Sequence, residues 1–209
     1  LLVFLSMLQA KNTFAQTYPP RPIVYGVNPF LPRIYGYDTT QNWSRVISRQ
    51  PFISGFTITS FGGLAFDPCT YQTYATATFA SLGEISHLVK MDLTTGICIN
   101  VGSLGDNFAS IQFDRNGNLY GVTDDAAIQP EQFYAIDKTN ASKTLLTALG
   151  NGGTGEVIAY NRYNDMMFHF SGDPNVVYEK FIKSSPYTVT GITNGPPGVE
   201  IYGALYLGP

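Results

Sequence analysis

Apolar and polar residues alternate along most of the chain in short segments, and three of these segments share one pattern. They are GGLAFDPCTYQTYATAT from Gly62, ASIQFDRNGNLYGVTDD from Ala109 and EVIAYNRYNDMMFHFSG from Glu156. Each has a short apolar strand ending in an aromatic residue and Asp or Asn, then a polar turn and a second strand. The aromatic positions are 47 residues apart (113−66 and 160−113): Phe66, Phe113 and Tyr160. This spacing predicts a repeated structural unit.

The second half of the unit also repeats. HLVKMDLTTGICINVGSLG, ending at Gly105, resembles QFYAIDKTNASKTLLTALG, ending at Gly150. Both predict a strand, a turn and another strand, so a unit contains four strands; in the third unit we expect them at about 109–114, 118–123, 132–137 and 143–149. This is the spacing of a propeller blade. A β-sandwich also uses short strands but does not need the repeated aromatic-Asp-turn pattern. The predicted fold class is therefore all-β, a β-propeller of four-stranded antiparallel blades.

The repeats divide residues 23–209 into blades. We expect a partial blade at 23–50, full blades at 60–105, 106–150 and 151–195, and the start of another at 199–209. The last strand could complete the first blade and close a ring of four. The alternative, which we favour, is an incomplete ring, a fragment of about six to eight blades. The chain lacks an initiator Met and stops directly after a predicted strand.

The first residues predict export. LLVFLSML at 1–8 is too short to span a bilayer and is typical of the apolar region of a signal peptide. We expect a truncated signal peptide at 1–15 and a linker at 16–22; the alternative is a buried N-terminal strand or helix. Because no later apolar run is long enough for a membrane span, we expect a secreted, periplasmic or cell-surface protein.

The strings NGNLYGVTDD, FYAIDKTNASKTLLTALG and KMDLTTGICINVGSLG resemble the repeats of secreted bacterial β-propeller proteins. The resemblance covers residues 24–209. It implies a propeller in an exported protein, often beside adhesion or secretion-sorting modules and mostly of unassigned function. FIKSSPY departs from the Ile-Asp-Thr-Thr-Gly turn of these repeats, which leaves the outer hairpin of the last full blade less well supported.

Composition argues against a nucleic-acid partner and leaves open whether the two cysteines form a disulfide. The chain is 44% hydrophobic and 13% charged, with a net charge of −3 and no run of Lys or Arg, so no nucleic-acid partner is expected. Cys69 and Cys98 are the only cysteines in the sequence. In an exported protein they can form a disulfide, or they can be two separate buried thiols.

Recurring Asp residues have a structural interpretation. The segment 114–118, Asp-Arg-Asn-Gly-Asn, suggests a calcium loop, but an EF-hand needs Gly at its sixth position and Glu at its twelfth, where this chain has Leu119 and Asp125. We therefore expect a hairpin turn there. Asp38, Asp92 and Asp137 precede Thr-Thr or Lys-Thr, and we expect them to cap turns.

The loops between the second and third strands of each blade differ, and loops on a rigid scaffold carry function. Their acidic and His residues are the binding-face candidates: Glu84, His87, Asp124, Asp125, Glu131, His169 and Asp173. The two His lie in different blades without local ligand spacing, so neither a metal site nor another cofactor is expected. The predicted function is an exported, non-catalytic binding or scaffold module for protein or glycan ligands. The alternative is a propeller enzyme, such as a metal-dependent hydrolase or lactonase, with its site at the channel mouth.

Overall fold

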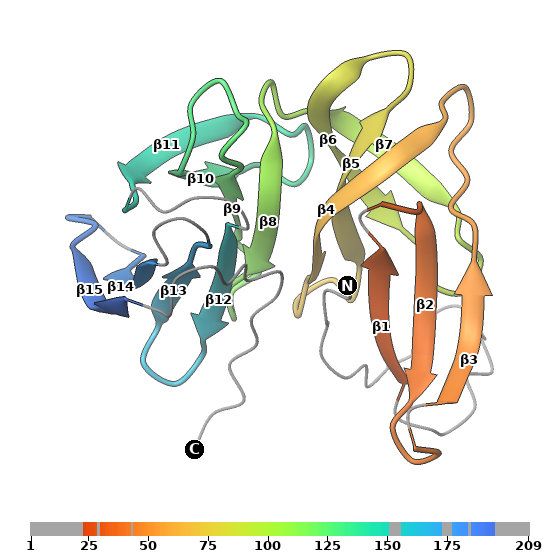
Figure 1. The fold of residues 1–209 in the computed structure, drawn as a ribbon, viewed down its shortest axis with the longest axis horizontal. Helices are drawn as coiled ribbons and strands as arrows, with labels where there is room; N and C mark the ends of the chain where they lie inside the picture. Colours follow the sequence, from red (N-terminus) through yellow and green to blue (C-terminus); the bar gives the residue numbers. More distant parts are fainter. Residues whose placement is uncertain are drawn as a thin grey trace.

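The strands form four successive antiparallel sheets that lie around a common centre as the blades of a β-propeller (Figure 1). The structure, a computed structural model, describes residues 23–28, 30–42, 44–150, 156–172, 177–183 and 185–194, and these contain strands and turns but no helix. The prediction of an all-β propeller with antiparallel blades is confirmed. The proposed signal peptide, the linker and the segment 199–209 lie outside the described residues.

Each blade pairs its strands in sequence order. Among the described residues, blade one has three strands: β1 (Ile23–Asn28), β2 (Arg33–Asp38) and β3 (Ser44–Arg49). Blade two has β4 (Ile58–Phe66), β5 (Thr73–Phe79), β6 (Gly83–Met91) and β7 (Cys98–Ser103). Blade three has β8 (Phe108–Phe113), β9 (Leu119–Thr123), β10 (Gln132–Ile136) and β11 (Lys143–Ala148). Blade four has β12 (Val157–Asn161), β13 (Met166–Phe170), β14 (Val177–Ile182) and β15 (Val189–Asn194).

The strands of blade three begin and end within about one residue of the expected positions. In Figure 1, β4, β8 and β12 lie nearest the centre, while β7, β11 and β15 lie at the periphery. Because the strands of each blade are antiparallel and joined in sequence order, their connections alternate between the two ends of the blade. We call the end that carries the β5–β6, β9–β10 and β13–β14 connections the loop face, and the end that carries the β4–β5 and β6–β7 hairpins the turn face.

Alternation along each strand places the core between the sheets. On β9, Leu119 packs with residues of blade two, while the next residue, Tyr120, packs with Met167 and Phe181 of blade four. One apolar cluster fills each of the three junctions between consecutive blades. Burial of this apolar surface is the main stabilising term of such a fold, at roughly 25 cal/mol per Å². Because both faces of these sheets are covered, β5 and β9 are buried over nearly their whole length.

The turns form as the sequence predicts. Asp114 Oδ1 accepts hydrogen bonds from the backbone N–H groups of Asn116 and Asn118, each at 2.9 Å. Gly117 has φ of 77°, a value that glycine adopts without strain. The segment is therefore a hairpin turn.

The three Asp residues expected to cap turns do so in the same way. Asp38, Asp92 and Asp137 each accept two bonds through Oδ1 from the Thr two positions later, 2.8 Å from its N–H and 2.6 Å from its hydroxyl. These bonds satisfy backbone donors that the turn would otherwise leave unpaired.

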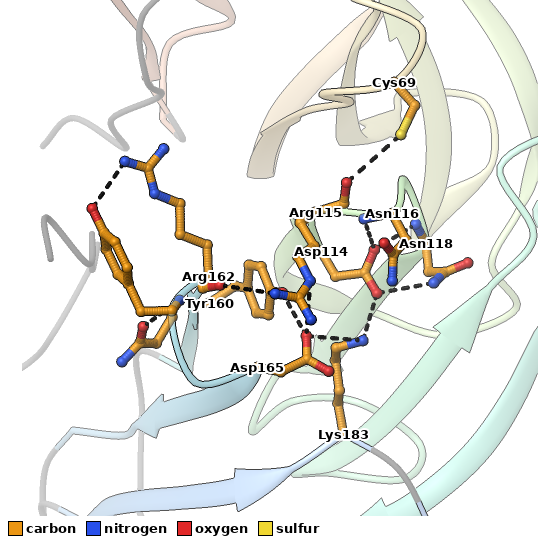
Figure 2. Close-up of polar contacts among 11 residues, drawn as sticks. Cys69, Asp114, Arg115, Asn116, Asn118, Tyr160, Arg162, Asp165 and Lys183 are labelled. Atoms are coloured by element: carbon orange, nitrogen blue, oxygen red, sulfur yellow. Dashed lines mark hydrogen bonds and ion pairs between the residues drawn. The ribbon is translucent and has the colours of Figure 1, made fainter.

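Ion pairs that were not predicted from the sequence also join consecutive blades. Lys138 Nζ lies 2.5 Å from Asp67 Oδ2, and Lys183 Nζ lies 2.7 Å from Asp114 Oδ2. The lysines are 45 residues apart (183−138) and the aspartates 47 (114−67), so the same ion pair recurs at two junctions. Figure 2 shows Lys183 between Asp114 and Asp165, the latter at 3.4 Å.

The two cysteines are free, so of the two possibilities left open by the sequence the structure has separate thiols. Cys69 is exposed in the β4–β5 hairpin, with Sγ 3.8 Å from Arg115 O of blade three. Cys98 is buried in the cluster between blades one and two, and burial raises its pKa to about 11. Both lie at the turn face of blade two, but the two side chains face opposite neighbouring blades.

Candidate functional site

The expected binding-face residues divide into several environments. His87, on β6, lies against the Phe79 ring at 4.8 Å and its Nδ1 lies 3.3 Å from Asn100 Oδ1, on the side of blade two that faces blade one. Glu84 is near the start of β6. Glu131 is 5% exposed with φ of 54°, and its carbonyl accepts a bond from Leu149 N at 2.9 Å. Asp173 lies outside the described residues. None of these contacts joins them in one site.

His169, in contrast, is at the centre of a buried polar group in blade four. Its Nδ1 lies 3.1 Å from Glu179 Oε2, and its Nε2 makes a short contact with Glu156 Oε2. The N–H of Gly150 donates to the same oxygen of Glu179 at 2.8 Å. His169 is fully buried and Glu156 is 1% exposed. An imidazole held between two carboxylates in such an environment strongly favours the imidazolium form.

The pKa shifts of these three groups follow from that arrangement. Burial opposes a charge on His169, but the hydrogen bonds to Glu156 and Glu179 outweigh it and raise its pKa. The hydrogen bond from His169 lowers the pKa of Glu179, whereas burial raises that of Glu156 despite the same neighbour. We therefore infer that Glu179 is the carboxylate that stays ionised. Of the two carboxylates that contact His169, Glu156 is the one that takes a proton more easily.

Asp124 and Asp125, from the β9–β10 loop, extend this group across the junction of blades three and four. Asp124 is half-buried; burial, followed by its hydrogen bond with Asp125, raises its pKa to about 6. The negative charge of Glu156 also raises the pKa of Asp124, and that of Asp125 raises the pKa of Glu156. We call these five residues the acidic cluster: Asp124, Asp125, Glu156, His169 and Glu179.

The loop that carries Asp124 and Asp125 is held by a fixed anchor. Asp106, just before β8, accepts bonds from the N–H groups of Ile128 at 2.7 Å and Gln129 at 3.2 Å. The hydroxyl of Thr123 donates to the carbonyl of Gln129 at 2.6 Å. These bonds leave Ile128 71% exposed. The loop therefore presents an apolar residue and a carboxylate on an ordered backbone.

Three members of the acidic cluster are particular to blade four. Strand pairing places Thr73, Leu119 and Met167 opposite the repeated aromatic residues. Two positions further on, His169 corresponds to Ala75 of blade two and Gly121 of blade three. Glu179, the strand partner of His169, corresponds to Val89 and Tyr134. Glu156 corresponds to Ala109 and Gly62 at intervals of 47 residues (156−109 and 109−62). The site residues that sequence reasoning missed, Glu156 and Glu179, could have been found by comparing blades position by position.

The chemistry available to the cluster is proton storage and recognition of positive charge. The His169 nitrogens are both bonded to carboxylates, so the imidazole is not free to act as a base toward a substrate. In the described ranges no group of three or more His, Cys, Asp or Glu has an arrangement able to hold a metal ion. The same ranges contain no helix long and apolar enough to cross a membrane.

Comparison with known protein families and with curated proteins gives no match. Solved structures do match. An auxiliary nutrient binding protein from Bacteroides thetaiotaomicron has a TM-score of 0.57 and 12% identity, over 85% of this chain and 40% of its own. A protein of unknown function from the same organism has a TM-score of 0.58 and 13% identity, over 88% and 51%. A chain of a mitotic checkpoint complex has a TM-score of 0.54 and 10% identity, over 88% and 54%.

These similarities concern the fold, because the identities are too low to carry a function. This chain spans between 40% and 54% of the length of the three chains. The fold and the site together define a β-propeller of a kind compatible with a binding module.

Proposed function

We propose that this chain is an exported, non-catalytic binding module that recognises a protein or glycan surface through its loop face. The observation that carries the proposal is the β9–β10 loop, where Asp106 fixes a backbone that presents Ile128 and Asp125 to solvent. An ordered loop binds with a smaller loss of conformational entropy than a flexible one. The nearest imidazole is enclosed by carboxylates, which supports recognition in preference to turnover.

Two further parts of the proposal concern the complete protein. We propose that residues 1–15, with their apolar run at 1–8, are signal-peptide sequence, which supports export. We also propose that residues 23–209 belong to a propeller with more blades than the four described here. The shares of 40% to 54% in the similar solved chains support the larger ring.

The test is a binding screen with a matched pair of variants. The chain is immobilised and probed with a glycan array and with extracellular proteins, and hits are quantified by surface plasmon resonance. The double variant Asp125→Asn/Ile128→Ser alters the β9–β10 loop, and the control Ile99→Ser alters another exposed isoleucine, on the edge strand β7. We expect the loop variant to lose at least about tenfold in affinity and the control to retain it.

Two results would reject the proposal. One is a ligand whose affinity is the same for the loop variant and the wild type. The other is metal-dependent turnover of an ester or lactone panel, which would favour the enzyme alternative.

A further inference from the structure

Three buried carboxylates of blades two and three, Asp67, Asp106 and Asp114, follow one rule, to which the acidic cluster is an exception. Asp67 receives bonds from the N–H groups of Cys69 and Thr70 and from the ammonium group of Lys138. Asp114 is served by two backbone N–H groups and by Lys183. Each of these carboxylates therefore has a lysine and several donors, as a buried negative charge requires.

Asp106 follows the same rule, and this matters because it lies at the loop face. It accepts bonds from the N–H groups of Asn107, Ile128 and Gln129, and Lys143 Nζ lies 3.9 Å from its Oδ2. Asp106, the buried carboxylate of blade three at the loop face, thus has a lysine nearby.

Glu156 does not follow this rule. Its Oε2 contacts His169, but its Oε1 is buried and has no hydrogen-bond partner among the residues that the structure describes. Leaving such an atom unsatisfied costs a protein stability, so each instance calls for an explanation. Apart from His169, the charged groups that act on Glu156 are Asp125 and Glu179, both negative, and Glu156 in turn acts on Asp124. The cluster thus has four carboxylates and one imidazole.

We propose that the acidic cluster binds a cationic N–H donor, an ammonium or guanidinium group such as that of a lysine or arginine side chain on the ligand. The group would be held by Glu156 Oε1 and the Asp124–Asp125 pair. This inference rests on the proposed binding function and names the chemistry of its ligand. An N–H cation fits better than a metal ion, because the cluster lacks metal-ligand geometry and because ammonium groups already fill the equivalent role at Asp67 and Asp114.

Solvent access and pH dependence follow from the same groups. Asp125 is exposed and Asp124 half-buried, so a ligand reaches the cluster from the β9–β10 loop. Because the pKa of Asp124 is raised to about 6, the pair gains negative charge between pH 5 and pH 7. Binding of a cation must therefore weaken as the pH falls over that range.

The experiment is isothermal titration calorimetry of the full chain at pH 7 with N-acetyl-lysine methylamide, N-acetyl-arginine methylamide and the neutral, nearly isosteric N-acetyl-norleucine methylamide. We expect at least one cationic probe to bind about tenfold more tightly than the neutral one and to weaken at pH 5. Glu156→Gln and, separately, Asp125→Asn should each reduce that affinity by about tenfold. Asp165→Asn removes one carboxylate from the turn face of the same blade and should leave it unchanged. Asp125 is exposed, so its variant tests the site even if Glu156→Gln fails to fold.

Equal binding of the norleucine and cationic probes would overturn the inference, and so would affinities that both site variants leave unchanged. Binding of calcium chloride without binding of either cationic probe would also overturn it, in favour of a metal site. Absence of all binding would also overturn it. A glycan or protein ligand that depends on the β9–β10 loop but not on Glu156 would leave the proposed function intact while this inference fails.

Discussion

Asp124 illustrates how a single side chain can make stability depend on pH. Burial, followed by its hydrogen bond with Asp125, raises its pKa to about 6 from an ordinary value of 3.8. A carboxyl group whose pKa is higher in the folded state stabilises the protein fully below pH 3.8, and that contribution is lost as the pH rises through about 6. Ionisation of Asp124 therefore lowers the stability of the folded protein at neutral pH, as expected of a residue in a binding site.

We predict that Asp124→Asn removes this dependence. The amide keeps an oxygen that can accept the bond from Ala126 N, 3.0 Å away in the wild type, but it cannot ionise. The variant should gain stability relative to the wild type as the pH rises, with most of the change between pH 4 and pH 6 and little further change above the folded pKa. Urea unfolding at pH 4, 5, 6 and 7 measures the difference, and parallel curves for the two proteins would show that the pKa is not raised.

His169 has the opposite role, since its positive charge compensates two buried carboxylates. We predict that His169→Ala lowers the free energy of unfolding by about 3–5 kcal/mol at pH 6, the usual cost of leaving a buried charge without its partner. Because the pKa of His169 is raised, the stabilisation is complete below pH 6.5 and is lost as the pH rises through the folded value. Denaturant unfolding at pH 6 and pH 9 checks both statements; a cost that is the same at both pH values would contradict the charge-based account.

At the scale of the strand and blade, the same three positions can be exchanged as a unit. We predict that Glu156→Ala/His169→Ala/Glu179→Val, which gives blade four residues found at these positions in blades two and three, is more stable than His169→Ala alone. The triple variant removes both carboxylates that contact His169, so neither is left buried without its partner. Apolar replacement of buried ion pairs is often neutral. Thermal unfolding compares the two, and a triple variant less stable than the single one would mean that the cluster has a net stabilising role.

Backbone contact between blades sets a second constraint at this scale. A Cβ atom on Gly62 would lie 2.3 Å from Phe108 O of blade three, whereas a Cβ on Gly191 in β15 has no atom within 4 Å. We predict that Gly62→Ala costs at least about 1–3 kcal/mol through overpacking, and that the matched control Gly191→Ala is neutral or slightly stabilising. Equal unfolding midpoints for the two variants would contradict the close packing of β4 on β8.

The strands could be predicted because the information for them is local. Alternation and turn-forming residues fix β8 to β11, and a capping Asp such as Asp92 needs only the two or three residues that follow it. The acidic cluster required more. Whether His169 meets Glu179 depends on strand register, and whether it meets Glu156 depends on where β12 begins; neither can be obtained from spacing alone. His87 and His169, which the sequence places in different blades, lie at different blade junctions.

At the scale of the whole molecule, the Asp–Lys pairs join neighbouring blades across long sequence separations, here the 71 residues between Asp67 and Lys138. Asp67 is fully buried; burial opposes its charge, but Lys138, Thr70 and the backbone N–H groups lower its pKa. A carboxylate with a lowered pKa stabilises the fold above its unfolded value of 3.8, and that contribution is lost as the pH falls through the folded value. The junctions therefore depend on ion pairs as well as on apolar packing.

We predict that Lys138→Met lowers the free energy of unfolding by about 3 kcal/mol at pH 7, because Asp67 then keeps its backbone donors but loses its cation. The matched variant Lys180→Met removes a lysine from strand β14 that lies outside these pairs, and it should change stability by less than about 0.5 kcal/mol. In a double-mutant cycle, Asp67→Asn should make the Lys138→Met change cost much less than it does in the wild type, which isolates the ion pair from lost packing. Since the pair spans blades two and three, hydrogen exchange should be faster in both β5 and β10 of the Lys138→Met variant. Faster exchange in blade three alone would mean that the lysine stabilises its own blade and does not join the two.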